Sequence, residues 1–391
     1  MTEQVTSRTN NGILYISLSG RVDATNASAV EEDIHAVRAA NPGLPTVIDA
    51  DDLAYISSAG LRVIMRLRKD EPKLAIINAS DEVYQVFEMT GFTDMMKIEK
   101  AYRRISVDGC EFIARGANGI VYRYDPETIV KVFFNPDALP EIEQERKNAR
   151  TAFVLGMNTA IPYDIVRVGN GYGMRSELLS ATSISKMMIR DPEHLEEPVR
   201  LFVDTLKHIH SIQAEPGDFP EMKNEAIGWA KFVKDYIPAE QYDKLISLVQ
   251  ALPNSLTLLH GDYHGGNVMV QNGETILIDM DTLATGHPIL ELSAMYNAYV
   301  GFGEIDPDST IKFHGYPFEV GVRFWKLALA RYLGTDDEDA IRAVEEKAMV
   351  ISYARMLRRA VRRNVPDRDA RVKRSQEMLA ELLPRVDSLT F

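Results

Sequence analysis

The pattern of apolar residues changes near residue 108 of this 391-residue chain, and the change divides the chain into two units of different architecture. In the first unit, short apolar runs at 13–19, 46–50 and 74–78 alternate with segments whose apolar residues recur at helical spacing. Strands that are joined through helices of roughly ten residues pair in parallel. The first unit is therefore predicted to be an α/β domain.

After residue 108, the strand signals follow one another through short turns that contain Gly or Asp-Pro, which predicts antiparallel pairing. The strands of this second unit are predicted at 110–114, 120–124, 128–134, 161–168 and 172–178. A helix is predicted at 140–155, and helical patterns dominate after residue 198 except at a hairpin around Asn272-Gly273. The second unit is therefore predicted to be an α+β domain in which an antiparallel lobe precedes a mainly helical lobe.

Composition and charge exclude several classes of protein. Cys110 is the single cysteine, so the chain cannot form an internal disulfide, and a reducing compartment is expected. The 44 basic and 57 acidic residues give a net charge of −13, which disfavours general nucleic-acid binding. Residues 1–11 are polar, and no apolar run approaches the roughly 18 residues of a membrane span. The sequence predicts a cytoplasmic protein without a nucleic-acid or membrane partner.

The clearest chemical pattern is the sequence HGDYHGGN, which is followed by the predicted hairpin and by the sequence IDMD. Phosphoryl transfer needs a carboxylate that orients the attacking hydroxyl, and it needs oxygen ligands that hold Mg²⁺ on the phosphates. Asp262, Asn267 and Asp279 supply these groups, and the hairpin returns Asp279 to the end of the lobe that carries Asp262. Asp281 is interpreted as a second metal or substrate carboxylate or as a loop cap. His260 is expected to support the loop.

A glycine-containing turn precedes these residues in the chain. Gly116 and Gly119 lie between two predicted strands, where glycine lets the backbone approach phosphate groups. Lys131 lies on the next strand, from which it can reach nucleotide phosphates if a glutamate of the following helix holds its side chain. Glu145 is the first candidate for that glutamate, and the glutamates two and four positions earlier in the same helix remain alternatives.

These residues resemble the aminoglycoside phosphotransferase and choline kinase-like family, over about residues 109–391. The resemblance implies a bilobal protein kinase-like fold that uses ATP and Mg²⁺. It implies that Asp262 is the catalytic residue and that Asn267 and Asp279 bind the metal.

For the nucleotide, the same resemblance implies that Lys131 contacts the ATP phosphates. The sequence SELL at 176–179, with Glu177 and Leu179, is similar to the family's hinge, where backbone groups meet adenine. The sequence HGD, where protein kinases have HRD, favours the branch of the family that acts on small molecules.

The first unit carries a resemblance of its own. Its sequence AYISSAGLRVI at 54–64 looks like the signature of STAS domains, the anti-sigma factor antagonist family. In that family a serine at a helix start is phosphorylated by a partner kinase, and the resemblance assigns that serine to Ser58. A phosphate at a helix N-terminus is favoured by the free N–H groups and by the helix dipole. The alternative interpretation is that Ser57 and Ser58 only cap the helix.

The predicted domains are a STAS domain at 1–106 and a kinase-like domain at 107–391, with lobes at about 107–180 and 181–391. The predicted function is ATP- and Mg²⁺-dependent transfer of the γ-phosphoryl group to a hydroxyl acceptor, a small molecule, coupled to a STAS domain that regulates and binds a protein partner.

Two alternatives to this function remain open. One is a protein serine kinase that acts on Ser58 of a STAS domain, and the other is a non-catalytic signalling scaffold that senses nucleotide. Residues 109–340 contain 20 basic and 34 acidic residues, a net charge of −14. A cationic acceptor is therefore expected for the transferase.

Overall fold

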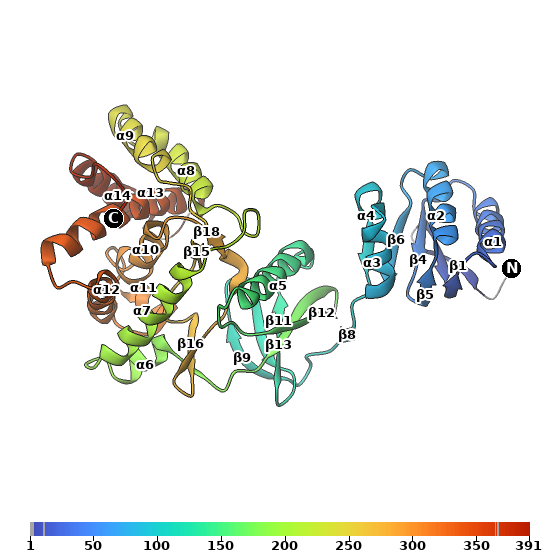
Figure 1. Cartoon of the computed structure of the whole chain (residues 1–391), viewed down its shortest axis with the longest axis horizontal. Helices are drawn as coiled ribbons and strands as arrows, with labels where there is room; N and C mark the ends of the chain where they lie inside the picture. The colour runs from blue at the N-terminus through green and yellow to red at the C-terminus, as the bar shows by residue number, and fades with distance from the viewer. Residues whose placement is uncertain (1–3, 11, 364, 366) are drawn as a thin grey trace. The chain divides into compact units, whose positions relative to one another are not determined.

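The computed structural model of the chain describes residues 4–10, 12–363, 365 and 367–391. Parts of the polar start, residues 1–3 and 11, lie outside the described residues. The chain divides into two compact units, Met1–Ile105 and Ser106–Phe391 (Figure 1). No helix in the described part of the chain combines the length and the apolar character that crossing a membrane requires.

The first unit is an α/β domain built on a sheet with the strand order β1-β2-β4-β6-β7. The strands are β1 (Val5–Asn10), β2 (Ile13–Leu18), β3 (Gly20–Val22), β4 (Thr46–Asp49), β5 (Leu53–Ile56), β6 (Ala75–Ala79), β7 (Ile98–Lys100) and β8 (Arg104–Ile105). The helices are α1 (Ala27–Ala40), α2 (Ser58–Asp70), α3 (Asp81–Met89) and α4 (Phe92–Met95). Parallel pairing from β2 to β7 confirms the predicted architecture, whereas the edge strand β1 pairs antiparallel with β2.

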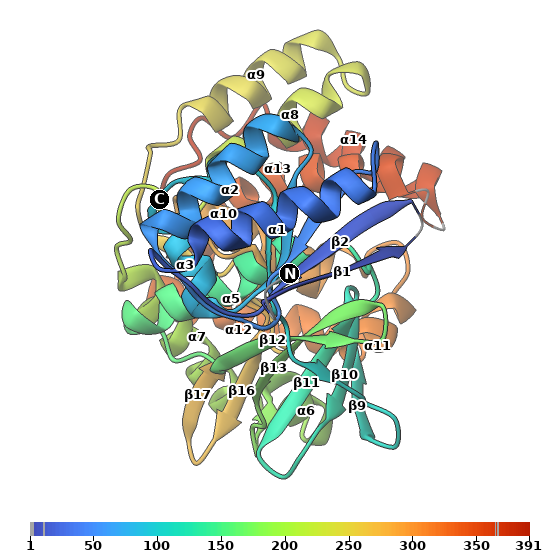
Figure 2. The same ribbon diagram turned by 90° about the vertical axis from the view of Figure 1, so that its right-hand side faces the viewer.

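A buried core stabilises this unit. Ile16, Ile48 and Ile76 face one another in register on β2, β4 and β6, and each is at most 1% exposed. Burial of such side chains contributes about 1.5–3 kcal/mol each. Helices α1 and α2 pack against each other beside this sheet (Figure 2).

The second unit begins with an antiparallel sheet in which the strands follow the order β12-β13-β11-β10-β9. These strands are β9 (Glu111–Arg115), β10 (Gly119–Arg123), β11 (Thr128–Phe133), β12 (Pro162–Val168) and β13 (Gly171–Glu177), and helix α5 (Leu139–Val154) lies between β11 and β12 in the chain. The antiparallel pairing confirms the prediction. Lys131 lies on β11 at the centre of this sheet, opposite Val121 of β10 and Met174 of β13.

The rest of the second unit is mainly helical, as predicted. Its helices are α6 (Ile184–Arg190), α7 (Glu196–Ser211), α8 (Met222–Phe232), η1 (Val233–Asp235), α9 (Ala239–Gln250), η2 (Met280–Thr282), α10 (Ile289–Tyr296), η3 (Asn297–Gly301), α11 (Asp308–His314), α12 (Phe318–Leu333), α13 (Glu338–Arg363) and α14 (Arg368–Leu382). Its short strands are β14 (Thr182–Ser183), β15 (Leu258–Leu259), β16 (Val268–Gln271), β17 (Glu274–Leu277) and β18 (Ala284–Thr285).

The hairpin predicted from Asn272-Gly273 is confirmed. Strands β16 and β17 pair antiparallel, with Val268 opposite Leu277, and the two turn residues have φ angles of +54° and +84°. Positive φ at both positions is the geometry that Asn-Gly favours in a two-residue turn. The hairpin thus brings the segment after β17 back beside the segment before β16.

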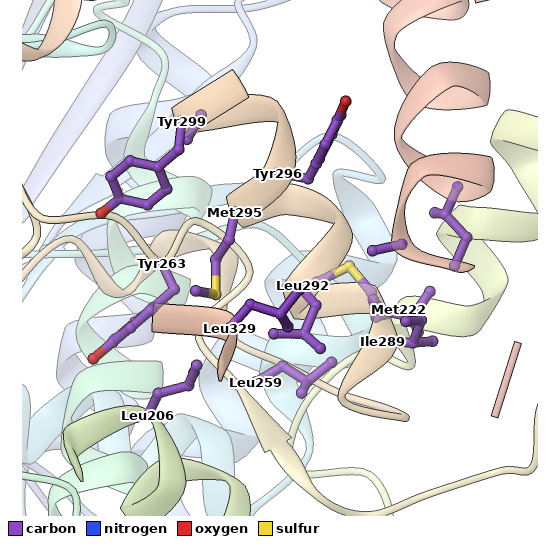
Figure 3. Close-up of a cluster of buried hydrophobic side chains, with 14 of the residues drawn as sticks. Leu206, Met222, Leu259, Tyr263, Ile289, Leu292, Met295, Tyr296, Tyr299 and Leu329 are labelled. Carbon is purple, nitrogen blue, oxygen red and sulfur yellow. The ribbon is translucent and has the colours of Figure 1, made fainter. Parts of the chain in front are cut away.

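Apolar side chains fill the space beneath these two segments. Figure 3 shows Tyr263, Met295, Leu259 and Leu206 in one cluster, to which α7, β15, α10 and the segment after β15 all contribute. Tyr263 is 1% exposed, and its hydroxyl donates to the backbone oxygen of Phe202 at 2.7 Å. A closely packed core of this kind leaves the loop above it little freedom to move.

Candidate active site

The segment 260–267 forms a loop between β15 and β16, and a buried carboxylate anchors its first turn. The backbone N–H groups of His260 and Gly261 donate to the two oxygens of Glu291 at 2.6 and 3.0 Å. Gly261 has a φ of +82°, and a Cβ atom there would lie 2.2 Å from the backbone oxygen of Thr282. Only glycine fits that position without displacing backbone.

Glu291 lies on α10 and is fully buried. Burial raises the pKa of its carboxyl to about 7, although the hydrogen bonds from the loop N–H groups oppose this shift. Residue motifs gave no indication of this anchor, because it lies 31 positions after His260. One feature of the sequence does point to Glu291: it is the single carboxylate in the apolar run ILELSAMY. A buried charge in such a run is costly unless it is hydrogen-bonded.

His260 connects the loop to the segment that carries Asp279. Its Nε2 lies 3.1 Å from the backbone oxygen of Ile278, and the ring is fully buried. Burial lowers the pKa of this imidazole, so the ring is neutral and Nε2 carries the proton that the carbonyl accepts. This arrangement agrees with the interpretation of His260 as a support for the loop.

Asp262 is exposed at the tip of the same loop. Its carboxylate lies 3.6 Å from Nε2 of His264, whose Nδ1 accepts a hydrogen bond from the Gly266 N–H at 3.1 Å. Desolvation opposes ionisation of Asp262, but His264 and the more distant Arg355 stabilise the charge and lower its pKa to about 2. Asp262 is therefore a carboxylate across the physiological pH range.

His264 is a site residue that the sequence patterns did not identify. Because its Nδ1 accepts from Gly266, its Nε2 is a donor, and this is the nitrogen that faces Asp262. The ring also contacts His314, with centroids 5.2 Å apart. This contact fixes the position of His264 beside the carboxylate.

Asn267 and Asp279 are brought to the same end of the lobe as Asp262. The side-chain N–H of Asn267 donates to the backbone oxygen of Asp262 at 3.0 Å, and the backbone oxygen of Asn267 accepts from the Ile278 N–H at 3.1 Å. Asp279 follows directly, with a φ of +66° that is rare for a residue other than glycine. Strained backbone of this kind is found preferentially at functional sites.

Lys131 from the sheet lobe reaches this end of the helical lobe. Its Nζ donates to Glu145 at 2.9 and 3.1 Å and to Asp279 at 2.9 Å. Burial opposes the charge of Lys131, but the two carboxylates outweigh it and raise the pKa of the ammonium. Burial also raises the pKa of Glu145, and the charge of Asp279 adds to this effect. The three groups form one network that spans 148 residues of sequence.

A second buried contact supports this network. Asn148 of α5 donates from its side chain to the backbone oxygen of Met280 at 3.1 Å, and the side chain of Gln144 donates to Asn148 at 2.7 Å. Helix α5 therefore holds both Glu145 and the turn that follows Asp279. Sequence patterns did not indicate Asn148, whose partner lies 132 positions later.

Gly116 and Gly119 close the turn between β9 and β10, where the Gly116 N–H donates to the Gly119 oxygen at 2.9 Å. A Cβ atom at Gly119 would lie 2.4 Å from the backbone oxygen of Val132, so no larger residue fits there. Within this turn, the side chain of Asn118 donates to Asp281 at 3.3 Å. The glycine turn thus contacts the segment that carries Asp279.

The segment 176–179 continues from the end of β13. The Glu177 carboxylate accepts from the Ile161 N–H at 2.8 Å, and the Leu178 N–H donates to the Glu127 oxygen at 2.8 Å. These contacts fix the backbone next to Leu179. A role of Glu177 and Leu179 in adenine binding stays a prediction.

Asp279, Asp281 and Glu145 gather negative charge at this end of the lobe. Burial, then the charges of Asp279 and Glu145, raise the pKa of Asp281 to about 7, which indicates an excess of negative charge. Among the described residues, no group of three or more His, Cys, Asp or Glu side chains is arranged to hold a metal by itself. Mg²⁺ commonly binds to one or two carboxylates together with substrate phosphates, so Asn267 and Asp279 fit such a role.

In the first unit, the structure distinguishes Ser57 from Ser58. Ser57 is the N-cap of α2, and its hydroxyl accepts from the Ala59 N–H at 3.2 Å. Ser58 is the first residue of the helix and is exposed. Capping therefore falls to Ser57, and the hydroxyl of Ser58 is accessible to modification.

Comparison with known proteins relates each unit to a family. Residues 109–318 match the phosphotransferase enzyme family, and residues 4–105 match the STAS domain. The anti-sigma-B factor antagonist of Listeria monocytogenes is 31% identical over 88 residues, which are 22% of this chain and 76% of that protein.

Solved structures with similarity to this chain include two kinases. An ADP-bound aminoglycoside phosphotransferase, APH(2'')-Ib, is 16% identical, with 72% of this chain and 94% of that chain covered and a TM-score of 0.45. A choline/ethanolamine kinase family protein from Mesorhizobium loti is also 16% identical, with 70% and 87% covered and a TM-score of 0.44.

Proposed function

Because the chain belongs to the phosphotransferase enzyme family and joins that domain to a STAS domain, we propose that it transfers the γ-phosphoryl group of Mg²⁺-bound ATP to a hydroxyl group of a small molecule. The observation that carries the proposal is the Lys131 network, in which one ammonium contacts Glu145 and Asp279 at 2.9 Å. Two carboxylates hold this lysine at the end of the lobe, and an ammonium group in such a position is suited to binding nucleotide phosphates.

In the proposed reaction, the acceptor hydroxyl oxygen forms a bond to the γ-phosphorus while the bond from phosphorus to the β,γ-bridging oxygen breaks. The hydroxyl proton is released to solvent, and ADP leaves. Asp262 accepts the hydrogen bond of the acceptor hydroxyl and orients it toward phosphorus. Because its pKa is about 2, Asp262 acts mainly through orientation and charge and not as a strong base.

The groups proposed for the nucleotide and metal surround the same end of the lobe. Asn267 and Asp279 would hold Mg²⁺, and Lys131 would contact the phosphates. When bound, the metal neutralises the charge on the phosphate oxygens. The turn at Gly116 and Gly119 would bring backbone N–H groups toward the phosphates, with Glu177 and Leu179 at the adenine end.

Incubation of the full chain with γ-labelled ATP and Mg²⁺ tests this proposal. We expect label to appear on small hydroxyl compounds from a panel that spans neutral, cationic and anionic members. Label on the protein itself would instead support the protein serine kinase alternative. No transfer to any acceptor, with ATP still bound, would contradict the proposal and favour a nucleotide-sensing scaffold.

The STAS domain offers a site at which the transferase activity could be regulated. We expect Ser58→Asp to change either turnover or binding to a protein partner, because a negative charge at the start of α2 imitates a phosphate. Turnover and partner pull-down are the measurements. The charge is compatible with folding, since helix N-termini favour anions.

The matched controls are Ser58→Ala and Ser57→Ala. Ser58→Ala should change the free energy of unfolding by less than about 0.5 kcal/mol, because Ser58 is exposed and is not the cap. Ser57→Ala should cost about 1 kcal/mol, measured by urea unfolding, without the effect on turnover. If Ser58→Asp behaves like Ser58→Ala in turnover and in partner binding, Ser58 has no regulatory role.

The charge of the acceptor that the enzyme prefers depends on the side chains that bind the acceptor. The net charge of −14 over residues 109–340 attracts cations at long range. Salt screens such attraction over about 8–10 Å, so side chains close to Asp262 have more influence on which acceptor is bound.

A further inference from the structure

A cavity of about 500 Å³ opens between α8 and α13 of the helical lobe. Its lining residues are Glu225, Trp229, Arg355, Arg358, Arg359, Arg362 and Arg363. The size lies in the range of small-molecule binding sites. The five arginines recur at helical spacing on the last turns of α13, so one helix directs all of them to one surface.

No carboxylate in the described part of the chain forms an ion pair with these arginines. Within the described residues, none of the five forms a hydrogen bond or an ion pair. Instead, Arg355 lies over the ring of Trp229 at 4.9 Å, and Arg359 lies over the ring of Phe302 at 4.9 Å. Five neighbouring like charges repel one another, and a bound anion would relieve that repulsion.

Helix α13, which carries the five arginines, contacts α10, the helix that anchors the catalytic loop. The hydroxyl of Ser352 on α13 donates to the backbone oxygen of Ser293 on α10 at 2.7 Å. Two positions before Ser293, Glu291 anchors the loop that carries Asp262. Burial lowers the pKa of Arg355, while the charges of Asp262 and Glu291 oppose that shift. Arg355 lines the cavity, and the charge of Asp262 in the catalytic loop acts on it.

We propose that this cavity binds an anionic group of the phosphoryl acceptor, so that the acceptor is a hydroxyl compound that carries a phosphate or a carboxylate. Guanidinium groups bind both anions through paired N–H donors, and Arg is preferred for this purpose. The exposed carboxylate of Asp262 would then meet the hydroxyl at the other end of the acceptor. This inference rests on the proposed transferase activity and replaces the expectation of a cationic acceptor.

The ring of Trp229 adds a second feature to the cavity. It contributes apolar surface at the wall, beside Arg355, and such a surface packs against the carbon skeleton of a ligand. Glu225 is the acidic member of the lining and can accept hydrogen bonds from further hydroxyl groups. An anionic polyhydroxy compound can interact with the arginines through its anionic group, with Trp229 through its carbon skeleton and with Glu225 through its hydroxyl groups.

Binding of inorganic pyrophosphate tests the anion site without requiring turnover. The nucleotide site of the full chain is first saturated with a non-hydrolysable ATP analogue and Mg²⁺, and pyrophosphate is then titrated by calorimetry. We expect pyrophosphate to bind under these conditions, and the double variant Arg359→Gln/Arg362→Gln to weaken it by at least about tenfold. Both side chains are exposed, so the variant should fold.

Arg342→Ala is the matched control. Arg342 lies on the same helix, outside the cavity, and its side chain is 62% exposed. It should bind pyrophosphate like the unmodified chain. If pyrophosphate does not bind, or if it binds equally to all three proteins, the cavity is not an anion site.

Turnover then tests the assignment to the acceptor. With matched anionic, neutral and cationic hydroxyl compounds, kcat/KM should be highest for an anionic member and should fall with added salt. The double variant should lower kcat/KM for anionic acceptors alone. Pyrophosphate binding together with a preference for cationic or neutral acceptors would overturn the assignment. Absence of turnover with every acceptor would contradict the proposed function. If pyrophosphate still binds in that case, the cavity is an anion site although the transferase proposal has failed.

Discussion

Asp262→Asn is expected to lower kcat by about 10²–10⁴-fold and to leave the affinity for Mg²⁺-bound ATP within about twofold. The substitution removes the charge that orients the acceptor hydroxyl and keeps the size of the side chain. It also keeps the contact that positions Asn267, because Asn267 donates to the backbone oxygen of Asp262 and not to its carboxylate. Single-turnover rates and nucleotide titrations measure the two quantities separately.

The pH dependence of kcat in the unmodified chain and in Asp262→Asn gives a second test of this role. Because the pKa of Asp262 is lowered to about 2, its contribution is complete at neutral pH and is lost only as the pH falls toward that value. Ionisation of Asp262 should therefore cause no change in rate between pH 6 and 8. An equal loss of nucleotide affinity in Asp262→Asn would show that Asp262 belongs to the nucleotide site instead.

Asp279→Ala is expected to abolish the Mg²⁺ dependence of ATP binding, which is measured as the ratio of Kd values without and with the metal. A charged ligand to Mg²⁺ is worth at least about tenfold in this ratio, so the variant should bring the ratio close to one. Lys131 loses one partner in this variant but keeps Glu145 at 2.9 Å, so the lysine stays in position.

Two further variants control for backbone strain and for the neighbouring carboxylate. Asp279 has a φ of +66°, a conformation that Asn tolerates better than Ala, so Asp279→Asn separates loss of charge from loss of the turn. Asp281→Ala should keep the metal dependence. If metal-dependent binding persists in Asp279→Ala and disappears in Asp281→Ala, the ligand is Asp281.

Structural features that depend on neighbouring residues could be predicted best from the sequence. The alternation of strands and helices before residue 108 led to a parallel sheet, and Asn272-Gly273 led to the hairpin, because turn geometry and side-chain periodicity depend on neighbours in sequence. The antiparallel edge strand β1 was missed. Val5 is the one buried residue of this strand, so its sequence has no apolar periodicity from which a strand could be predicted.

Contacts between residues that lie far apart in the sequence could be identified only from the structure. Glu291 anchors His260 and Gly261, and Asn118 reaches Asp281 across 163 positions. No pattern in the chain encodes these pairs, since a hydrogen bond over such a separation forms only after the elements that carry the two residues have packed. The same holds for the assignment of the helix cap to Ser57, which depends on the backbone angles before α2.

The sequence by itself predicted that Asp262, Asn267 and Asp279 come together, because they lie on one loop and one hairpin whose geometry is local, and their chemical roles stay predictions. It also determined the net charge, which is a sum that ignores position. Only the tertiary structure decided how those charges are distributed. It joined Lys131 to Asp279, and it placed Glu225 and Trp229 of α8 beside the arginines that α13 carries at helical spacing. Electrostatic interactions depend on distance and burial, and both are fixed by packing.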